Sequence, residues 1–419
     1  MRTAITLERI REARERIQSA IAITPCVHSE SLSERTGCRV WFKFENLHRT
    51  GSFKERGALN KLLCLTRKQR KAGVVTASAG NHGQALAHHA TRLGCDTVVV
   101  MPEKTPLVKV TSTRRRGARV ILHGRNYDQA RSMAREIERN EYRIFVHGFD
   151  DPDVIAGQGT LVLECLEQSP VPDAMLVPIG GGGLIAGCAI ALQELHPSAK
   201  MIGVEPAHYA SMSHALTVGR PVSFPGKPSL ADGLAVKSVG KLPFAIVKER
   251  LHEIHTVTEE ELANAILVLL EVEKSLVEGA GAAALAALLH RESLRRELAG
   301  KTVLIPLCGG NIDVNVLSKI IDRGLAKDGR LGRFRVVVPD QPGSLSEVAK
   351  LVAQSGGNIL DIVHTRALAN TEVGEVAIDV VIETRGRDHL EELQNILTEA
   401  GLRLDALFPP SPTKQAEVT

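Results

Sequence analysis

The chain has 419 residues, of which 43% are hydrophobic and 24% are charged, and its 52 basic and 48 acidic residues give a formal net charge of +4. This length allows two or three domains with a large core. Neither sign of charge forms a long block and aromatic residues make up only 3% of the chain, which argues against a stacking surface for nucleic acid. We therefore expect no nucleic-acid partner.

The seven cysteines are scattered and never form a CxxC pair, which favours a reducing compartment and argues against a structural zinc site. The N-terminal segment is charged and amphipathic, unlike a signal peptide, and the longest strongly apolar stretch, 279–289, is too short to span a bilayer. We expect a cytoplasmic protein without a membrane partner.

Helices and strands are predicted in alternation over the first three quarters of the chain, a pattern typical of parallel sheets covered on both faces. Ligands in such α/β sheets bind at the carboxyl ends of strands, where three turns fall, at 78–83, 180–183 and 308–311. The predicted strands are 40–45, 73–77, 97–101, 119–122, 174–179, 201–204 and 302–307. The predicted helices include 7–21, 84–93, 107–116, 127–138, 161–168, 184–195, 260–270 and 315–323.

The pattern changes after a charged, glycine-containing segment, for which we predict a linker at 326–332. Beyond it the order of elements is βαββαβ, the ferredoxin-like arrangement. We predict a main domain at 1–325, a small separate domain at 333–408 and a disordered tail at 409–419.

A single lysine, Lys54, follows Ser52 in a stretch that begins a helix. Ser52 and Glu55 have the spacing of a capping box, which places Lys54 in the first helical turn. The helix dipole there disfavours a cation and lowers the pKa of the amine, and Schiff-base chemistry needs a neutral amine. The alternative is a solvated lysine without a chemical function.

Four consecutive glycines, 180–183, follow a strand and precede a helix, which predicts an anion site for a phosphate group. A tight turn is the simpler alternative. Gly181, Gly183 and Ala186 also fit a dinucleotide fingerprint, with Glu205 as the ribose-binding acid, so a nucleotide-dependent oxidoreductase is a competing hypothesis. It is disfavoured because the fingerprint lies deep in the chain and leaves Lys54 without a function.

Five motifs occur together in an order that resembles the threonine dehydratases (threonine ammonia-lyases) of the second pyridoxal-phosphate fold type, over nearly all of residues 1–325. The C-terminal part resembles the ACT regulatory domain. This resemblance implies two parallel-sheet α/β subdomains, the smaller one roughly 72–147 inserted in the larger. The motifs are SFKERGA (52–58), SAGNHG (78–83), IAGQGT (155–160), GGGG (180–183) and CGGN (308–311).

The resemblance implies pyridoxal 5'-phosphate as cofactor, held covalently by Lys54, with Phe53 against its ring and Asn81 on its phenolic oxygen. Cys308 stands where the family places a small neutral partner for the pyridine nitrogen. The phosphate would be held by Gly180, Gly181, Gly182, Gly183 and Leu184. The substrate carboxylate would be held by Ser78, Ala79, Gly80, Asn81 and His82.

A neutral partner for the ring nitrogen implies a weaker electron sink and favours elimination over transamination. The implied reaction is dehydration and deamination of L-threonine to 2-oxobutanoate and ammonia, and of L-serine to pyruvate, with Lys54 removing the α-proton. Statistics for cysteines alone favour a core thiol at Cys308.

Other activities on the same fold stay open. Similar serine racemases carry a serine where this chain has Ala79, so dehydration is favoured over racemisation. A dehydratase or racemase acting on serine, hydroxyaspartate or another β-hydroxy amino acid is the alternative. Related enzymes bind a divalent cation through an acid matching Glu205 and another acid six residues later, where this chain has Ser211. We therefore assign no metal ligand.

The segment 339–345 resembles the ligand loop of ACT domains, which usually form an amino-acid site between paired copies. This predicts an amino-acid effector and a homodimer or homotetramer. A purely structural dimerisation module is one alternative. An amino-acid sensor on an inactive enzyme fold is another, disfavoured because Lys54 and the cofactor turns are intact.

Overall fold

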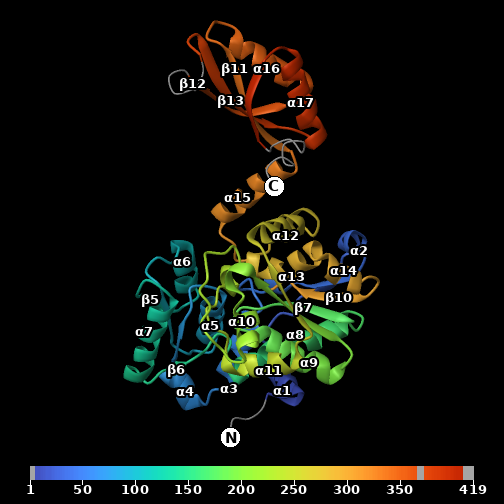
Figure 1. The fold of residues 1–419 in the computed structure, drawn as a ribbon. Coiled ribbons are helices and arrows are strands. Elements are labelled where there is room, and N and C mark those ends of the chain that lie inside the picture. The colour runs from blue at the N-terminus through green and yellow to red at the C-terminus, as the bar shows by residue number, and fades with distance from the viewer. Residues whose placement is uncertain (1–4, 366–371, 409–419) are drawn as a thin grey trace. The chain divides into compact units, whose positions relative to one another are not determined.

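The computed structural model describes residues 5–365 and 372–408 of the chain (Figure 1). Two compact units are present, Met1–Ile312 and Asp313–Thr419, and each is described by itself. The tail predicted at 409–419 lies outside the described residues. Within the described residues, no helix is both long and apolar enough to cross a membrane.

The first unit contains a six-stranded sheet in the order β1-β2-β10-β7-β8-β9, in which β1 is antiparallel to β2 and the other neighbours are parallel. Its central strands are apolar and buried on both faces, as a covered parallel sheet requires. The strands are β1 (Cys26–His28), β2 (Arg39–Lys43), β7 (Ala174–Pro178), β8 (Lys200–Pro206), β9 (Glu253–Val257) and β10 (Thr302–Pro306).

Helices cover both faces of this sheet (Figure 1). The helices α9 (Gly183–Leu195) and α13 (Gly279–His290) are apolar around most of their circumference, and both are almost entirely buried. The other helices of this part are α1 (Leu7–Ile17), α2 (Glu30–Thr36), α3 (Lys54–Cys64), α4 (Arg67–Ala72), α8 (Pro152–Gln168), α10 (Ser211–Val218), α11 (Lys241–Arg250), α12 (Glu259–Glu271) and α14 (Glu292–Glu297), with short 3-10 turns at Glu45–Leu47, Ala207–Tyr209 and Asp232–Leu234.

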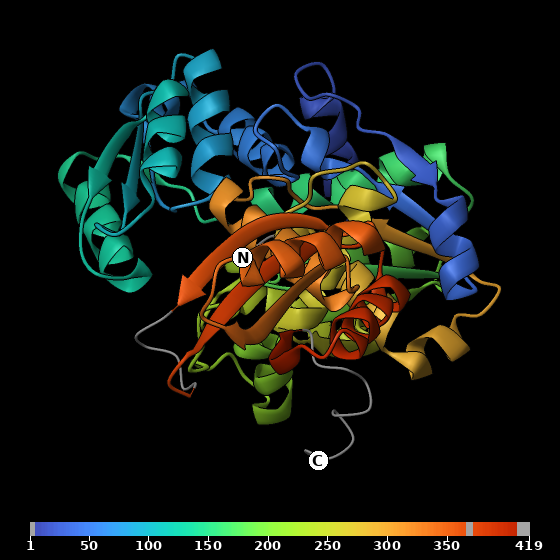
Figure 2. The same cartoon turned by 90° about the horizontal axis from the view of Figure 1, so that it is seen from above.

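A second, four-stranded parallel sheet in the order β5-β4-β3-β6 lies to one side of the first (Figure 2). Alternate residues of β4 explain its burial: Val98 and Val100 pack toward α7, whereas Val99 and Met101 pack toward α5 and α6. The elements are β3 (Val74–Ala77), α5 (Asn81–Arg92), β4 (Thr97–Met101), α6 (Leu107–Arg115), β5 (Arg119–Leu122), α7 (Tyr127–Asn140) and β6 (Ile144–Phe145).

The second unit begins with α15 (Val314–Lys327) and continues as a four-stranded antiparallel sheet in the order β12-β13-β11-β14. The order of its elements along the chain is βαββαβ, as the sequence predicts. The sheet and its two helices share one apolar core. The elements are β11 (Leu331–Pro339), α16 (Ser344–Ser355), β12 (Asn358–Thr365), β13 (Glu375–Glu383), α17 (Arg387–Glu399) and β14 (Arg403–Phe408).

Several predicted helix boundaries differ from the structure, among them the end of α1, at Ile17 and not 21, and the start of α5, at Asn81 and not 84. Helix α8 starts at Pro152, capped by Asp151, so Gly157 lies inside the helix that was predicted to begin at Leu161. A Cβ at Gly157 would lie 2.7 Å from the carbonyl oxygen of Arg56, so close packing of α8 on α3 explains this glycine. Helix α15 extends to Lys327, into the segment predicted as a linker.

Candidate active site

Backbone contacts bring the Lys54 stretch next to the 308–311 turn. Ser52 forms an isolated β-bridge with Gly309, and the Phe53 N–H donates to the Cys308 carbonyl at 3.1 Å. The 78–83 turn joins them through Asn81, whose Oδ1 accepts from Nδ2 of Asn311 at 2.8 Å. Turns that are distant in sequence therefore meet at the carboxyl ends of the strands, as the topology predicts.

Lys54 is the first residue of α3, and its amine lies between a ring and a carbonyl. Nζ donates to the Gly148 carbonyl at 3.0 Å and lies 4.9 Å from the centroid of the Phe53 ring. Burial lowers the pKa of Lys54 to about 8, although Cys308 and Glu278 act in the opposite direction. The sequence predicts this direction from the helix dipole, and the structure adds burial as the main cause. The amine is therefore partly uncharged near neutral pH.

The predicted capping box is wrong. Phe53, already helical, is the N-cap of α3, and within the described residues the buried Ser52 hydroxyl has no hydrogen-bond partner. Glu55 instead accepts from the Thr50 N–H and lies 3.1 Å from Nε2 of His89. The β-bridge to Gly309 holds Ser52 outside the capping position, which explains the difference.

A network of buried ion pairs joins α3 to neighbouring elements. Arg56 donates to Glu45 at 2.6 and 2.7 Å and to Glu164 at 2.6 and 2.8 Å. Lys43 adds a second cation, with Nζ 2.8 Å from Glu164. The Arg56, Lys43 and Glu45 side chains are fully inaccessible to solvent, so two cations and two carboxylates balance within the core.

The glycine run leads from β7 into α9, and two of its residues explain why glycine is needed. Gly182, the N-cap of α9, has a φ of +91°, which disfavours residues with a Cβ. A Cβ at Gly181 would lie 2.2 Å from the ring of Phe149. The first N–H groups of α9 have no acceptor within the helix, and they lie at its positive end. This end suits an anion.

The 78–83 turn is held by its own serine. Ser78 Oγ accepts from the N–H groups of Gly80 at 3.3 Å and Gly83 at 3.1 Å, which orders the entry to α5. The His82 ring is buried with Nε2 3.2 Å from the Val146 carbonyl, and burial, with the charge of Lys54, lowers its pKa to about 3. His82 is therefore neutral, and its ring is engaged away from the turn.

Comparison with known proteins decides the family. Residues 17–309 match the family model described as pyridoxal-phosphate dependent enzyme, and residues 333–399 match the ACT domain model. An L-threonine ammonia-lyase from Thermotoga maritima is 44% identical over 397 residues, which cover 95% of this chain and 98% of that protein. The chain belongs to the threonine dehydratase family of pyridoxal-phosphate-dependent enzymes.

Solved structures agree with this family. The processed form of threonine deaminase isoform 2 from Solanum lycopersicum matches with a TM-score of 0.70 and 34% identity, covering 75% of this chain and 92% of that chain. A serine racemase from Dictyostelium discoideum matches with a TM-score of 0.70 and 36% identity, covering 74% and 99%. The predicted fold type is confirmed, and pyridoxal phosphate is the cofactor of this threonine dehydratase family member.

The residues of the candidate active site fit this cofactor. Lys54 offers a partly neutral amine beside the Phe53 ring, and the start of α9 offers unpaired N–H groups for a phosphate. Cys308 is buried, its Sγ lies 3.4 Å from the Pro306 carbonyl, and burial raises the pKa of its thiol well above the usual range. The thiol is therefore neutral, as its predicted position beside the pyridine nitrogen requires.

Glu278 is a residue that the sequence analysis missed in this threonine dehydratase family member. It is the buried N-cap residue of α13, and its Oε1 accepts from Nδ2 of Asn81 at 2.7 Å. Burial, with the negative charge of Asp232, raises the pKa of Glu278 to about 7. The sequence did contain a signal for Glu278: it is a single carboxylate directly before a long apolar helix, and the helix dipole favours a negative charge at that position.

Glu278→Gln is expected to remove part of the pH dependence of stability. A carboxylate with a pKa near 7 when folded and near 4.3 when unfolded stabilises the fold at acidic pH, and this contribution is lost as pH rises from about 4 to 7. Urea unfolding near pH 5 and near pH 7 should show wild-type stability falling relative to the variant by about 1 kcal/mol per pH unit. Parallel pH dependences would contradict this raised pKa.

Glu205 lies at the end of β8, as the sequence predicts, but its carboxylate already has hydrogen-bond partners within the chain. Its carboxylate is buried and caps α10, accepting from the Met212 N–H at 2.6 Å and from the N–H and hydroxyl of Ser213 at 3.0 and 2.8 Å. Ser211 donates instead to the Val236 carbonyl at 2.6 Å. These hydrogen bonds engage the Glu205 carboxylate at the start of α10, which argues against the ribose-binding acid that the dinucleotide hypothesis requires.

Proposed function

We propose that the chain is a threonine ammonia-lyase that converts L-threonine to 2-oxobutanoate and ammonia, and L-serine to pyruvate and ammonia. The observation that carries the proposal is the position of Lys54: a partly neutral amine beside the Phe53 ring, where the Ser78 and Cys308 turns meet. Relatives named as L-threonine ammonia-lyases support the substrate.

Bound pyridoxal phosphate supplies an electron sink that makes the α-proton of the amino acid acidic. Lys54 takes this proton, because its lowered pKa keeps the amine partly neutral at the pH of the reaction. Departure of the β-hydroxyl group with a proton then gives water and an enamine. Hydrolysis of the enamine yields the 2-oxo acid and ammonia, so the water lost in elimination is regained.

The 78–82 turn binds the carboxylate of the substrate through its backbone. Ser78 orders the turn, and Asn81 starts a helix whose first N–H groups are unpaired within the helix. The amide of Asn81 is held by Glu278 and Asn311, and in this orientation it would hold the phenolic oxygen of the cofactor. These contacts position the amino acid against Lys54.

Dehydration is favoured over racemisation because racemisation needs an acid on the opposite face of the substrate. The chain has Ala79 where the similar racemases carry a serine, and alanine has no proton to give. The likeness to a serine racemase structure therefore reflects the shared fold.

An assay of three products tests the proposed reaction. We expect 2-oxobutanoate from L-threonine, pyruvate from L-serine, and no D-serine above background by chiral chromatography. One methyl group discriminates by about 1–3 kcal/mol, so the two substrates should differ by less than about 200-fold in kcat/KM. D-Serine formation faster than pyruvate release would contradict the proposal in favour of the racemase.

The second unit is proposed to bind an amino-acid effector and to make the enzyme a homodimer or homotetramer. The proposed ligand loop is the turn before α16, in which Gly343 has a φ of +102° and the Ser344 hydroxyl donates to the Pro339 carbonyl at 2.8 Å. The ACT match supports an amino acid as the ligand.

We also place the enzyme in the cytoplasm, on the basis of seven free cysteines.

Removal of residues 330–419 is expected to leave threonine turnover and to abolish regulation. A regulatory ligand typically changes affinity about 5–150-fold, so its loss is measurable in the KM for threonine. The standard amino acids are tested one at a time on the full chain and on the truncated chain. Regulation that persists undiminished in the truncated chain would place the effector site in the first unit.

A further inference from the structure

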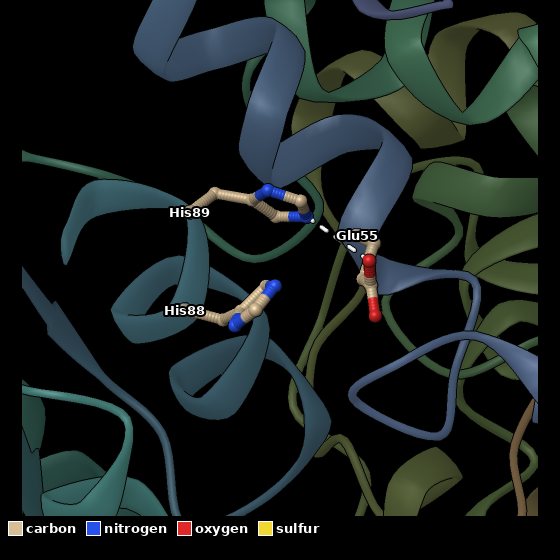
Figure 3. A group of neighbouring side chains, drawn as sticks. All are labelled: Glu55, His88 and His89. Carbon is tan, nitrogen blue, oxygen red and sulfur yellow. Dashed lines mark hydrogen bonds and ion pairs between the residues drawn. The ribbon is translucent and has the colours of Figure 1, made fainter. Parts of the chain in front are cut away.

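Three side chains that metal ions commonly use gather where α3 packs on α5. Glu55 lies in the first turn of α3, and His88 and His89 lie near the end of α5, with both rings on the side of Glu55 (Figure 3). One ligand atom from each residue lies within 4.8 Å of the other two. None of these residues is used in the reaction proposed above.

Of these three residues, His88 has a buried ring nitrogen without a hydrogen-bond partner among the described residues. This atom, Nε2, is inaccessible to solvent. An unsatisfied buried polar group is unfavourable, so a ligand that satisfies it is favoured. The His88 side chain as a whole is only partly buried, which leaves a path for an ion from solvent.

Glu55 is fixed in place by two contacts. Its carboxylate accepts from the Thr50 N–H and lies 3.1 Å from Nε2 of His89. His89 would exchange this contact for the metal, so that one carboxylate and two imidazoles supply the ligand atoms.

We propose that Glu55, His88 and His89 bind one zinc ion. Two histidines and one glutamate are a frequent ligand set for Zn²⁺, with ligand bonds of about 2.0–2.2 Å, and water takes the fourth position. Tetrahedral ligands are then about 3.4 Å apart, so the cluster contracts modestly from its present spacing.

A positive charge close to Glu55, His88 and His89 limits the affinity of this site for zinc. The guanidinium of Arg116, which follows α6, interacts electrostatically with Glu55 and opposes a second cation. Its Nη2 donates to the Arg49 carbonyl at 3.3 Å, and its Nε lacks a partner among the described residues. The ion would join α3 to α5, the two helices that begin at Lys54 and Asn81.

Equilibrium dialysis of the holoenzyme against buffered free Zn²⁺, followed by metal analysis, tests the site. Wild type should hold one ion per chain at micromolar free Zn²⁺, and His88→Ala should bind at least about tenfold more weakly. His364→Ala removes an exposed histidine of β12 and serves as the matched control, with unchanged binding. X-ray absorption should show two imidazoles and no sulfur, which distinguishes this site from the exposed Cys64.

Equal zinc binding by wild type and His88→Ala, an absence of bound zinc at micromolar free ion, or sulfur ligation would each overturn the proposal. If His88→Ala does not fold, His88→Phe keeps the ring volume without a ligand nitrogen and replaces it. The readout is metal content, so it does not depend on the activity proposed above.

Discussion

Lys54→Ala is expected to lower threonine turnover by at least about 10⁴-fold, because it removes both the group that holds the cofactor and the base that takes the α-proton. The side chain makes one hydrogen bond, to the Gly148 carbonyl, so the fold should persist. Initial rates of 2-oxobutanoate release, with circular dichroism and urea unfolding on the same samples, provide the measurement.

Lys71→Ala is the control for this substitution, since Lys71 is an exposed lysine at the end of α4. It should keep wild-type turnover. A folded Lys54→Ala protein whose rate stayed within tenfold of wild type would remove Lys54 from the reaction.

Arg56→Met is expected to destabilise the first unit by about 3–5 kcal/mol, because only Lys43 then remains to balance the two buried carboxylates of Glu45 and Glu164. Lys43 contacts Glu164 and cannot replace the contacts to Glu45. Urea unfolding at neutral pH gives the change in free energy, and a variant too unstable to purify would agree with the same cause.

A surface pair gives the matched comparison. Arg119 and Glu141 form an ion pair at 2.7 Å, but both side chains are more than a third exposed, so Arg119→Met should cost at most about 1 kcal/mol. If Arg56→Met lowered the free energy of unfolding as little as Arg119→Met, the buried ion pairs would not be what stabilises the position of α3.

The sequence predicts the turns of the active site well because each turn carries its own local signal. A strand followed by glycines or by a capping residue marks the carboxyl end of a parallel sheet, and this pattern alone identifies the 180–183 and 78–83 turns. The spacing of Ser52 and Glu55 places Lys54 in the first turn of a helix, and the structure confirms this position although the capping box itself does not form.

Contacts between distant segments could not be predicted in the same way. Glu278 gains its raised pKa from burial beside Asn81, which lies 197 positions away in the chain. Arg56 and Glu164 are likewise 108 positions apart. From the sequence alone, a charged residue among apolar ones is assigned to a helix end or to the surface. A buried ion pair can be recognised only when the fold shows both partners.

The capping box shows how a correct local motif can be overruled. Ser52 and Glu55 have the right spacing, but the β-bridge of Ser52 to Gly309 makes Phe53 the N-cap and leaves Glu55 to pair with His89. The tertiary contact decided the local geometry. Gly157 is a similar case, because it packs against α3 inside a helix that was predicted to begin only at Leu161.

Borohydride reduction of the purified, pyridoxal-phosphate-loaded protein, followed by peptide mass spectrometry, tests the central claim most directly. Reduction converts an imine between a lysine and a carbonyl cofactor into a stable amine. We predict loss of the visible absorption band and a cofactor adduct on the peptide that contains Lys54. An adduct on another lysine, or a colourless protein that cannot be loaded with pyridoxal phosphate, would contradict the account.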